Sequence, residues 1–243
     1  MRMLTFSERT VKEILRDPLN LGFGLGFPLV LLFMLSAIQA NIPVSLFEIG
    51  SLTPGIAVFG LSFMTLFSAT LIAKDRSGSL LQRLYTTPMR AHDYILGYTL
   101  PMLPIALAQS AVCYGAAMAL GLDLSIHLLW AWLLILPMAL FFIALGLLCG
   151  SLFSDKQVGG ICGALLTNLS AWLSGTWFDL ALVGGVFQKL AYVLPFVHAV
   201  EMERAVLRED YAGIFPHLWW VLGYALAAVA VAVLVFTRKM KAE

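Results

Sequence analysis

Charged residues are scarce in this sequence. Asp, Glu, Lys and Arg make up only 12% of its 243 residues, whereas they account for about a quarter of a soluble domain. Apolar residues reach 60% and the mean hydropathy is +0.90, which is more than a soluble fold of this size can bury. The formal net charge of +1 leaves no field that would steer a polyanion, so no nucleic-acid partner is expected. The chain is therefore predicted to be an integral membrane protein.

The motifs of nucleotide, metal and redox chemistry are also missing. No lysine follows a glycine, which excludes a GxxxxGK[ST] phosphate loop, and there is no HExxH pair. The cysteines Cys113, Cys149 and Cys162 form no CxxC pair and lie inside apolar runs, where they are expected to be buried as small hydrophobes. We therefore expect neither a cofactor nor a metal ion on this chain.

Ser174-Gly175 resembles part of the GxSG motif of an intramembrane serine nucleophile, with His198 as the possible base. Trp172 occupies the place of the first glycine, so a protease is disfavoured.

His198 and Glu201 stand three residues apart and could bind a metal together with His217. No second pair at ligand spacing accompanies them. A surface helix from Val197 to Arg208, with Glu201 and Arg204 paired, is favoured instead.

Six stretches of the sequence are apolar and long enough to cross a bilayer as helices, which need about 20 residues each. Helices are expected because lipid cannot satisfy free backbone groups, and because the alternating polarity of a barrel is missing. The predicted fold is a single all-α membrane domain over residues 1–243. Its spans are predicted at about 20–40, 54–73, 94–120, 127–152, 157–176 and 216–236.

Glycines recur four residues apart in three places. Each pair is either a small face that lets helices approach closely or a chance spacing. The pairs are Gly22/Gly26, Gly146/Gly150 and Gly159/Gly163.

Basic residues gather on one side of the predicted spans. Twelve of the 15 lie before the first span, between the second and third, between the fourth and fifth, or after the sixth. The positive-inside rule makes that side cytoplasmic, so both termini are predicted to face the cytoplasm.

Residues 5–17 are predicted to form an amphipathic helix. Leu4, Val11, Ile14 and Leu15 can share one stripe, and basic residues lie on another. Such a helix is typical of the cytoplasmic membrane interface, beside anionic headgroups. The alternative is a solvated segment that leads into the first span.

Residues 177–196 are predicted to form a re-entrant hairpin that enters the membrane from outside. Its apolar pieces are too short to cross, and Gly184-Gly185 breaks the middle. The alternative is an ordinary extracellular loop with two interfacial helices. The residues that mark the hairpin are Trp177, Phe178, Asp179 and Pro195.

The loop between the second and third spans, residues 74–93, carries a short predicted helix at about 79–86. Basic residues flank this helix, and Pro88 prevents it from continuing. Its apolar face has nothing in its own chain to pack against except headgroups, and it suits a groove on a soluble partner. The face is made by Leu80, Leu81, Leu84 and Tyr85.

The order and spacing of several short motifs resemble the type-2 ABC transporter permeases, which are six-span half-transporters that pair with a separate ATPase. The resemblance covers nearly the whole chain. It departs from the common pattern at Ser79, Tyr98 and Asp179. The matching motifs are Arg16-Asp17-Pro18, Leu52-Thr53-Pro54-Gly55, Arg76 with Gly78, Leu80, Leu84 and Thr87-Pro88, Ile95-Leu96-Gly97, Leu173-Ser174-Gly175 with Phe178, and Leu194-Pro195.

This resemblance implies that two copies, or one copy with a paralogue, form a pore in the inner membrane of a prokaryotic-type cell. ATP and magnesium would bind to a separate ABC ATPase subunit. The resemblance also implies export of a drug, antibiotic, lipid-linked molecule or peptide. The residues it assigns to the ATPase contact, through a coupling helix in the 74–93 loop, are Arg76, Gly78, Leu80, Leu81, Arg83, Leu84 and Pro88.

Few polar side chains interrupt the spans, which suits a hydrophobic or amphipathic cargo. Thr167 and Asn168 in the fifth span are candidates for the translocation path, and hydrogen bonding between helices is their alternative role. A secondary carrier or channel that works without an ATPase remains the alternative function. It would be favoured by inverted repeats, which this sequence does not show.

Overall fold

The computed structural model describes residues 2–78, 80–81 and 89–242. Within these ranges every regular element is a helix, which confirms the all-α prediction. Two segments, η1 and η2, are π-helices. The helices are α1 (Arg2–Leu15), α2 (Pro18–Leu21), η1 (Gly22–Gly26), α3 (Phe27–Gln39), α4 (Ile49–Ser77), α6 (Ala91–Thr99), α7 (Met102–Ala119), α8 (Ile126–Leu134), α9 (Leu136–Leu152), α10 (Asp155–Val158), η2 (Gly159–Leu166), α11 (Thr167–Trp172), α12 (Leu180–Val183), α13 (Gly185–Val193), α14 (Pro195–Leu207) and α15 (Tyr211–Ala242).

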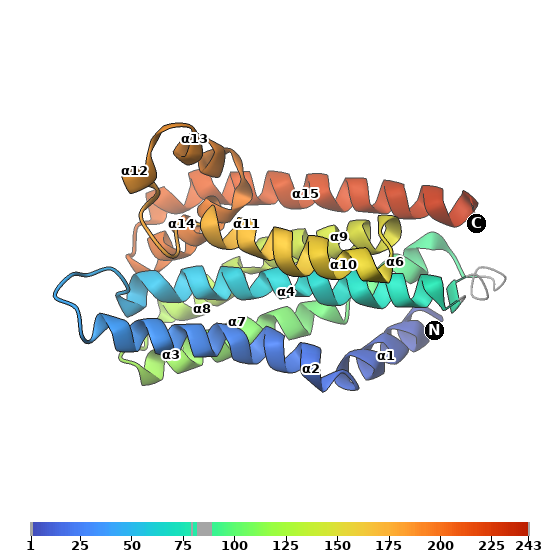
Figure 1. Cartoon of the computed structure of the whole chain (residues 1–243), viewed down its shortest axis with the longest axis horizontal. Coiled ribbons are helices and arrows are strands. Elements are labelled where there is room, and N and C mark those ends of the chain that lie inside the picture. Colours follow the sequence, from blue (N-terminus) through green and yellow to red (C-terminus); the bar gives the residue numbers. More distant parts are fainter. Residues whose placement is uncertain (1, 79, 82–88, 243) are drawn as a thin grey trace.

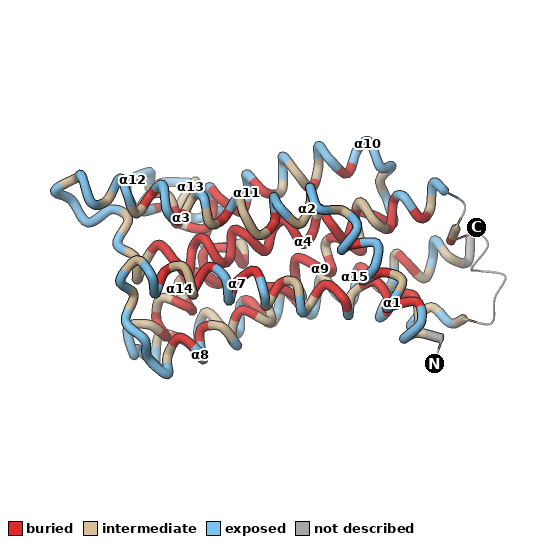
Figure 2. Tube along the Cα trace, turned by 90° about the horizontal axis from the view of Figure 1, so that it is seen from below, coloured by how far each residue is buried: buried red, intermediate tan, exposed pale blue. Residues whose placement is uncertain are grey.

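The helices form an elongated bundle with α4 running along its middle (Figure 1). α4 is buried along most of its length, between Leu52 and Ala73, where it packs against α3, α7, α9 and α14. Figure 2 shows that the buried residues concentrate along α4 and α9. Both chain termini lie at one end of the bundle, the terminal end, and α12 and α13 lie at the other, the hairpin end.

Five helical stretches are long and apolar enough to cross a membrane, and they coincide with five of the six predicted spans. The predicted span 157–176 corresponds to the continuous helix from α10 through η2 to α11, which is not among these five. Its membrane crossing therefore stays a prediction. The five stretches are Pro18–Gln39, Ile49–Ser77, Ala91–Ala119, Ile126–Leu152 and Tyr211–Met240.

Gly146 and Gly150 let α9 approach α4 closely. A Cβ at Gly146 would lie 2.6 Å from Cβ of Ser68, and one at Gly150 would lie 2.8 Å from the carbonyl oxygen of Ala69. Both distances are too short for carbon or oxygen neighbours, so this pair is a small-residue packing face. The other two pairs do not act in this way, because a Cβ would meet nothing within 4 Å at Gly22, Gly26 or Gly159.

α1 is a helix as predicted, but its buried face differs from the predicted stripe. Of the four residues assigned to that stripe only Ile14 is buried, while Leu4 and Leu15 are well exposed. The inner face is instead formed by Phe6, Thr10 and Ile14, which recur every four residues and therefore lie above one another. The stripe was misplaced because Thr10 is polar, and its hydroxyl donates to the carbonyl of Phe6 (3.1 Å) inside the helix.

α14 is a core helix, so the predicted surface helix from Val197 to Arg208 is wrong. Ten of its residues are buried, because α14 packs against α4, α8 and α15.

The predicted break at Gly184-Gly185 is confirmed: both residues have positive φ, at 61° and 58°, and separate α12 from α13. Of the predicted hairpin, residues 177–196, α12 and α13 are mostly exposed, and its entry into the membrane stays a prediction.

Candidate functional site

A cleft opens between the first-span helices η1 and α3, the central helix α4, and the segment from η2 to α11. Its volume is about 660 Å³, which is within the usual range for sites that bind small organic ligands. The wall is mostly aromatic, and we call the site the aromatic cleft. Its aromatic residues are Phe23, Phe27, Phe59, Phe63, Trp172, Trp177 and Phe178.

The aromatic rings of the cleft hold one another in place. Phe59 and Phe63 lie one turn apart on α4, with ring centroids 5.8 Å apart and nearly perpendicular planes. The ring centroid of Phe27, on α3, lies 6.2 Å from that of Phe59 and 6.0 Å from that of Phe63. Trp177 contacts Phe59 from the hairpin end, at 5.7 Å. Three of these four contacts are edge-to-face, an arrangement that favours fixed ring positions, so this part of the wall is preorganised.

Thr167 and Asn168, the two predicted path residues, both line this cleft. The Thr167 side chain is buried and its hydroxyl donates to the carbonyl of Cys162 (3.0 Å). Asn168 is exposed and its Nδ2 donates to the carbonyl of Ala164 (2.7 Å). Because both bonds stay within their own helix, the alternative role of bonding between helices finds no support in the described part of the chain.

The predicted hairpin residues serve different parts of the structure. Trp177 and Phe178 lie in the cleft wall. Asp179 accepts a hydrogen bond from the backbone N–H of Ala181 (2.9 Å) and so caps α12. Pro195 is buried at the first position of α14, where its missing N–H costs nothing.

Asp75 joins three helices at the terminal end. It lies near the end of α4, is only 6% exposed, and accepts hydrogen bonds from the guanidinium of Arg9 on both carboxylate oxygens; the contact from Nη2 to Oδ1 is 2.7 Å. The hydroxyl of Tyr98, from α6, donates to Oδ2 (2.7 Å). The hydrogen bond to Asp75 raises the pKa of Arg9 above its ordinary value. We call this group the Asp75 junction.

An aromatic contact supports the Asp75 junction. The Phe6 ring of α1 packs edge-to-face on Tyr98, with centroids 4.9 Å apart, and on Tyr94 at 5.7 Å. Gly97 makes room for this ring, because a Cβ there would lie 2.2 Å from Cδ1 of Phe6. The glycine of the Ile95-Leu96-Gly97 motif therefore lets α1 pack against α6.

The predicted coupling residues are only partly described. Arg83, Leu84 and Pro88 lie outside the described residues. Leu80 is partly exposed, but Leu81 is 1% exposed and packs in the same cluster as Phe6. The expectation that this apolar face has nothing in its own chain to pack against is therefore wrong for Leu81.

Arg76 and Gly78, also assigned to the coupling loop, bond to the last turns of α9 and α4, respectively. The Arg76 guanidinium donates to the carbonyl of Ser151 and, at 2.6 Å, to the carbonyl of Phe153, and so satisfies the end of α9. Gly78 caps α4, with its N–H on the carbonyl of Lys74 at 2.8 Å. Arg76 thus links α4 to α9 within the chain.

Glu203 is a second buried carboxyl, which the sequence analysis did not single out. It lies on α14, is fully buried, and accepts a hydrogen bond from the hydroxyl of Tyr114 on α7. Its other oxygen, Oε1, has no hydrogen-bond partner among the described residues. Burial raises the pKa of Glu203 to about 8. A helix that carries three charged residues suggested a surface, and nothing in the sequence reveals a partner 89 positions away.

Arg204 and His198 fix α14 in the bundle. Arg204 donates to the carbonyls of Ser51 (2.9 Å) and Gly175 (3.1 Å) as well as to the predicted partner Glu201 (2.8 Å). His198 is buried, which lowers its pKa, and it stacks in parallel on Trp220 with ring centroids 5.0 Å apart. These contacts connect α14 to α4, to the turn after α11, and to α15.

The His198–His217 pair does not build a metal site. The two Nδ1 atoms are hydrogen-bonded to each other at 2.8 Å, and Nε2 of His198 bonds to the carbonyl of Tyr192 (2.9 Å). Among the described residues no group of three or more His, Cys, Asp or Glu could hold a metal ion. The hydroxyl of Ser174 bonds to Ala171 and Thr176 instead of to a histidine. The geometry gives neither the metal nor the protease reading any support.

These features define a multi-pass helical membrane protein with an aromatic cleft on one side of its bundle. The family model of the ABC-2 type transporters matches residues 2–208, and the chain belongs to that family. It is thus the membrane-spanning component of an ABC transporter, a class of permease that works with an ATP-binding subunit. None of the curated proteins matches this chain.

Proposed function

We propose that this chain is the membrane subunit of an ATP-driven exporter, and that the aromatic cleft takes up a hydrophobic or amphipathic cargo. A separate ABC ATPase binds ATP and magnesium and drives the cycle. Two copies of the chain, or one copy with a paralogue, form the pore in the inner membrane of a prokaryotic-type cell. The terminal end faces the cytoplasm, and the helix from α10 to α11 is the sixth crossing.

The aromatic cleft is the observation that carries this proposal. A wall of fixed aromatic rings offers large apolar area at little cost in side-chain entropy. Asn168 is the exposed polar side chain in that wall, and within the described residues its Oδ1 accepts no hydrogen bond. This combination suits a cargo with an apolar body and one or two hydrogen-bond donors.

The Asp75 junction gives the proposal a route from the ATPase to the cleft. Closure of the ATPase pair pushes on the coupling loop, which connects α4 to α6. Because Asp75 ties α4 to α1 and α6, and Arg76 ties α4 to α9, these helices move as one unit. α4 also carries Phe59 and Phe63, so the displacement reaches the cleft wall.

The coupling role is tested in proteoliposomes that contain the chain and its ATPase. Leu80→Asp is expected to abolish the stimulation of ATP hydrolysis, because it places a charge on the partly exposed apolar face. Ser77→Asp is the matched control, since Ser77 is exposed at the end of α4. Wild-type stimulation with Leu80→Asp would remove the coupling loop from the proposal. Leu81→Asp is expected to reduce the amount of folded protein instead, because Leu81 is buried.

The cargo role is tested with Asn168→Leu in the same vesicles. Losing one hydrogen bond of about 0.5–1.5 kcal/mol should lower transport of an amphipathic dye roughly two- to twelvefold. Basal ATP hydrolysis and the melting temperature should stay unchanged. Leu165→Asn, at another exposed position of the same segment that does not line the cleft, is the control. Equal transport by the wild type and Asn168→Leu would exclude Asn168 from the path.

A further inference from the structure

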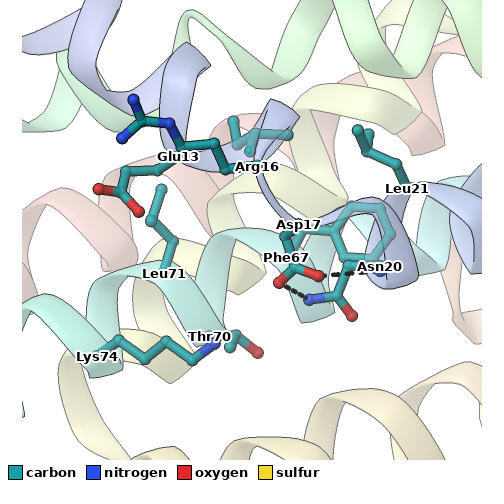
Figure 3. Close-up of a pocket in the computed structure, with 10 residues that line it drawn as sticks. Glu13, Arg16, Asp17, Asn20, Leu21, Phe67, Thr70, Leu71 and Lys74 are labelled. Atoms are coloured by element: carbon teal, nitrogen blue, oxygen red, sulfur yellow. Dashed lines mark hydrogen bonds between the residues drawn. The ribbon is translucent and has the colours of Figure 1, made fainter.

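A small pocket lies where α1 turns into the first span. Its volume is about 270 Å³, and it is enclosed by the end of α1, by α2 and by α4. Figure 3 shows Glu13 and Arg16 on one side, Thr70 and Lys74 of α4 on the other, and Asp17 with Asn20 at one end. Its remaining lining residues are apolar: Ile14, Leu21, Phe67 and Leu71. We call this site the elbow pocket.

The two acids of the elbow pocket already have partners. Asp17 accepts hydrogen bonds from the backbone N–H of Asn20 (3.2 Å) and, on its other oxygen, from Nδ2 of the same residue (2.6 Å). These contacts, drawn in Figure 3, cap α2. Glu13 lies 3.6 Å from the guanidinium of Arg9, which the Asp75 junction holds in place.

The two cations of the pocket are available for a ligand. Within the described residues, neither Arg16 nor Lys74 forms an ion pair, although both line the same cavity. They come from different elements, one after the end of α1 and one from the last turns of α4. In Figure 3 the two side chains lie on opposite sides of the cavity, and the guanidinium of Arg16 points away from Lys74. Both side chains are exposed, so the guanidinium can turn into the cavity, where an arginine and a lysine together can bind one phosphate.

We infer that the elbow pocket binds the phosphate of a phospholipid headgroup from the leaflet on the terminal side. The pocket lies beside α1, whose charged outer face and apolar inner face are typical of a helix at the membrane interface. Leu19 and Phe23, which follow Asp17 in the first span, are exposed apolar side chains that an acyl chain would contact. An anionic lipid fits best, because the acids are occupied and only the cations remain free.

Binding of a phospholipid here would fix the angle between α1 and the first span. The headgroup bridges Arg16 of the elbow to Lys74 on α4, next to the Asp75 junction. The lipid would then act as a third connection between α1 and α4, beside Arg9 and the apolar contact of Ile14.

The test is native mass spectrometry of the purified, delipidated chain with short-chain lipids. Dihexanoyl phosphatidylglycerol is expected to give one saturable adduct on the wild type, and dihexanoyl phosphatidylcholine a weaker one. Arg16→Gln with Lys74→Gln should weaken the phosphatidylglycerol adduct roughly tenfold or more, since each cation near an anionic headgroup contributes an appreciable part of the affinity. The charge-conserving pair Arg16→Lys with Lys74→Arg should keep it.

Two controls separate this site from general attraction to positive charge. Lys12→Gln with Lys239→Gln removes the same charge from outside the pocket and should leave the adduct unchanged; equal loss would contradict a built site. Inorganic phosphate should not displace the lipid at equal concentration, and efficient displacement would overturn the lipid as the ligand. None of these readouts needs the ATPase or the cargo, so the site can fail while the transport proposal holds, and the reverse.

Discussion

Among the described residues, the buried carboxyls Asp75 and Glu203 are held in different ways. At the terminal end, Asp75 receives a guanidinium on both oxygens and a hydroxyl on one of them. At the hairpin end, Glu203 receives a single hydroxyl, and one oxygen is unpartnered within the described residues. Asp75 therefore has a cationic partner, whereas the burial of Glu203 raises its pKa and favours the neutral acid.

This difference indicates that the terminal end of the bundle is the more rigidly connected one, and we call the Asp75 junction a fixed joint. A carboxyl group that accepts hydrogen bonds on both oxygens holds α1, α4 and α6 in one geometry. A half-satisfied carboxyl costs stability whenever it loses its proton, so the contact of α14 with α7 depends on conditions. The joint lies where the coupling loop begins, and the conditional contact lies where α14 packs against α7.

Asp75→Asn should have the largest effect on stability. It leaves the partly buried Arg9 with only the more distant Glu13, 3.6 Å away, as a counter-charge, and breaking the Arg9–Asp75 pair costs roughly 2–4 kcal/mol. The melting temperature in detergent measures this loss, and Glu8→Gln on the exposed side of α1 is the control, with little change expected. An unchanged melting temperature with Asp75→Asn would mean that this junction is not a fixed joint.

Gly97→Ala should have an intermediate effect. The new methyl group would collide with Phe6 and separate α1 from α6, at a cost of about 1–3 kcal/mol. Gly115→Ala is the matched control, since nothing lies within 4 Å of a Cβ there and a helical glycine-to-alanine change is expected to stabilise slightly. Thermal unfolding distinguishes the two. Equal effects would show that Gly97 is not needed for this contact.

Glu203→Gln should have the smallest effect near neutral pH, because it resembles the neutral acid. In the wild type the folded-state pKa of about 8 lies above the ordinary 4.5, so the folded chain binds more protons between these values. The contribution of the protonated Glu203 to the free energy of unfolding is complete below about pH 4.5 and is lost as the pH rises through 8. Melting temperatures from pH 6 to pH 9 should therefore fall further in the wild type than in Glu203→Gln.

Glu201→Gln is the control for this pH series, since Glu201 is partly exposed and bonded to Arg204. It should follow the wild-type curve. Parallel curves for the wild type and Glu203→Gln would contradict the assignment of Glu203 as a neutral acid.

The sequence alone predicted the features that follow from local chemistry. Apolar length located five of the six predicted spans, and Gly184-Gly185 marked the break between α12 and α13. Thr167 and Asn168 were singled out as path residues because polar groups are rare inside the spans; both line the aromatic cleft, and their role in transport stays a prediction. Each of these features depends on residues that are neighbours in the sequence, so it could be predicted without knowledge of long-range contacts.

The features that the sequence analysis missed depend on contacts between distant residues. Asp75 and Arg9 are 66 positions apart, and no local pattern indicates that they meet. α14 was mistaken for a surface helix because Glu201, Glu203 and Arg204 give it the charge of one. Glu203 bonds instead to Tyr114, and Arg204 bonds to Ser51 and Gly175, on other elements.

The central claim, a permease driven by a separate ATPase, is tested most directly by gentle purification of the tagged chain from its native membrane. The account predicts a stoichiometric soluble subunit with a phosphate-binding loop, retained by the wild type and by Ser77→Asp but lost with Leu80→Asp. A homogeneous chain without such a subunit, under conditions that keep other ABC complexes intact, would contradict the account and favour a carrier or channel.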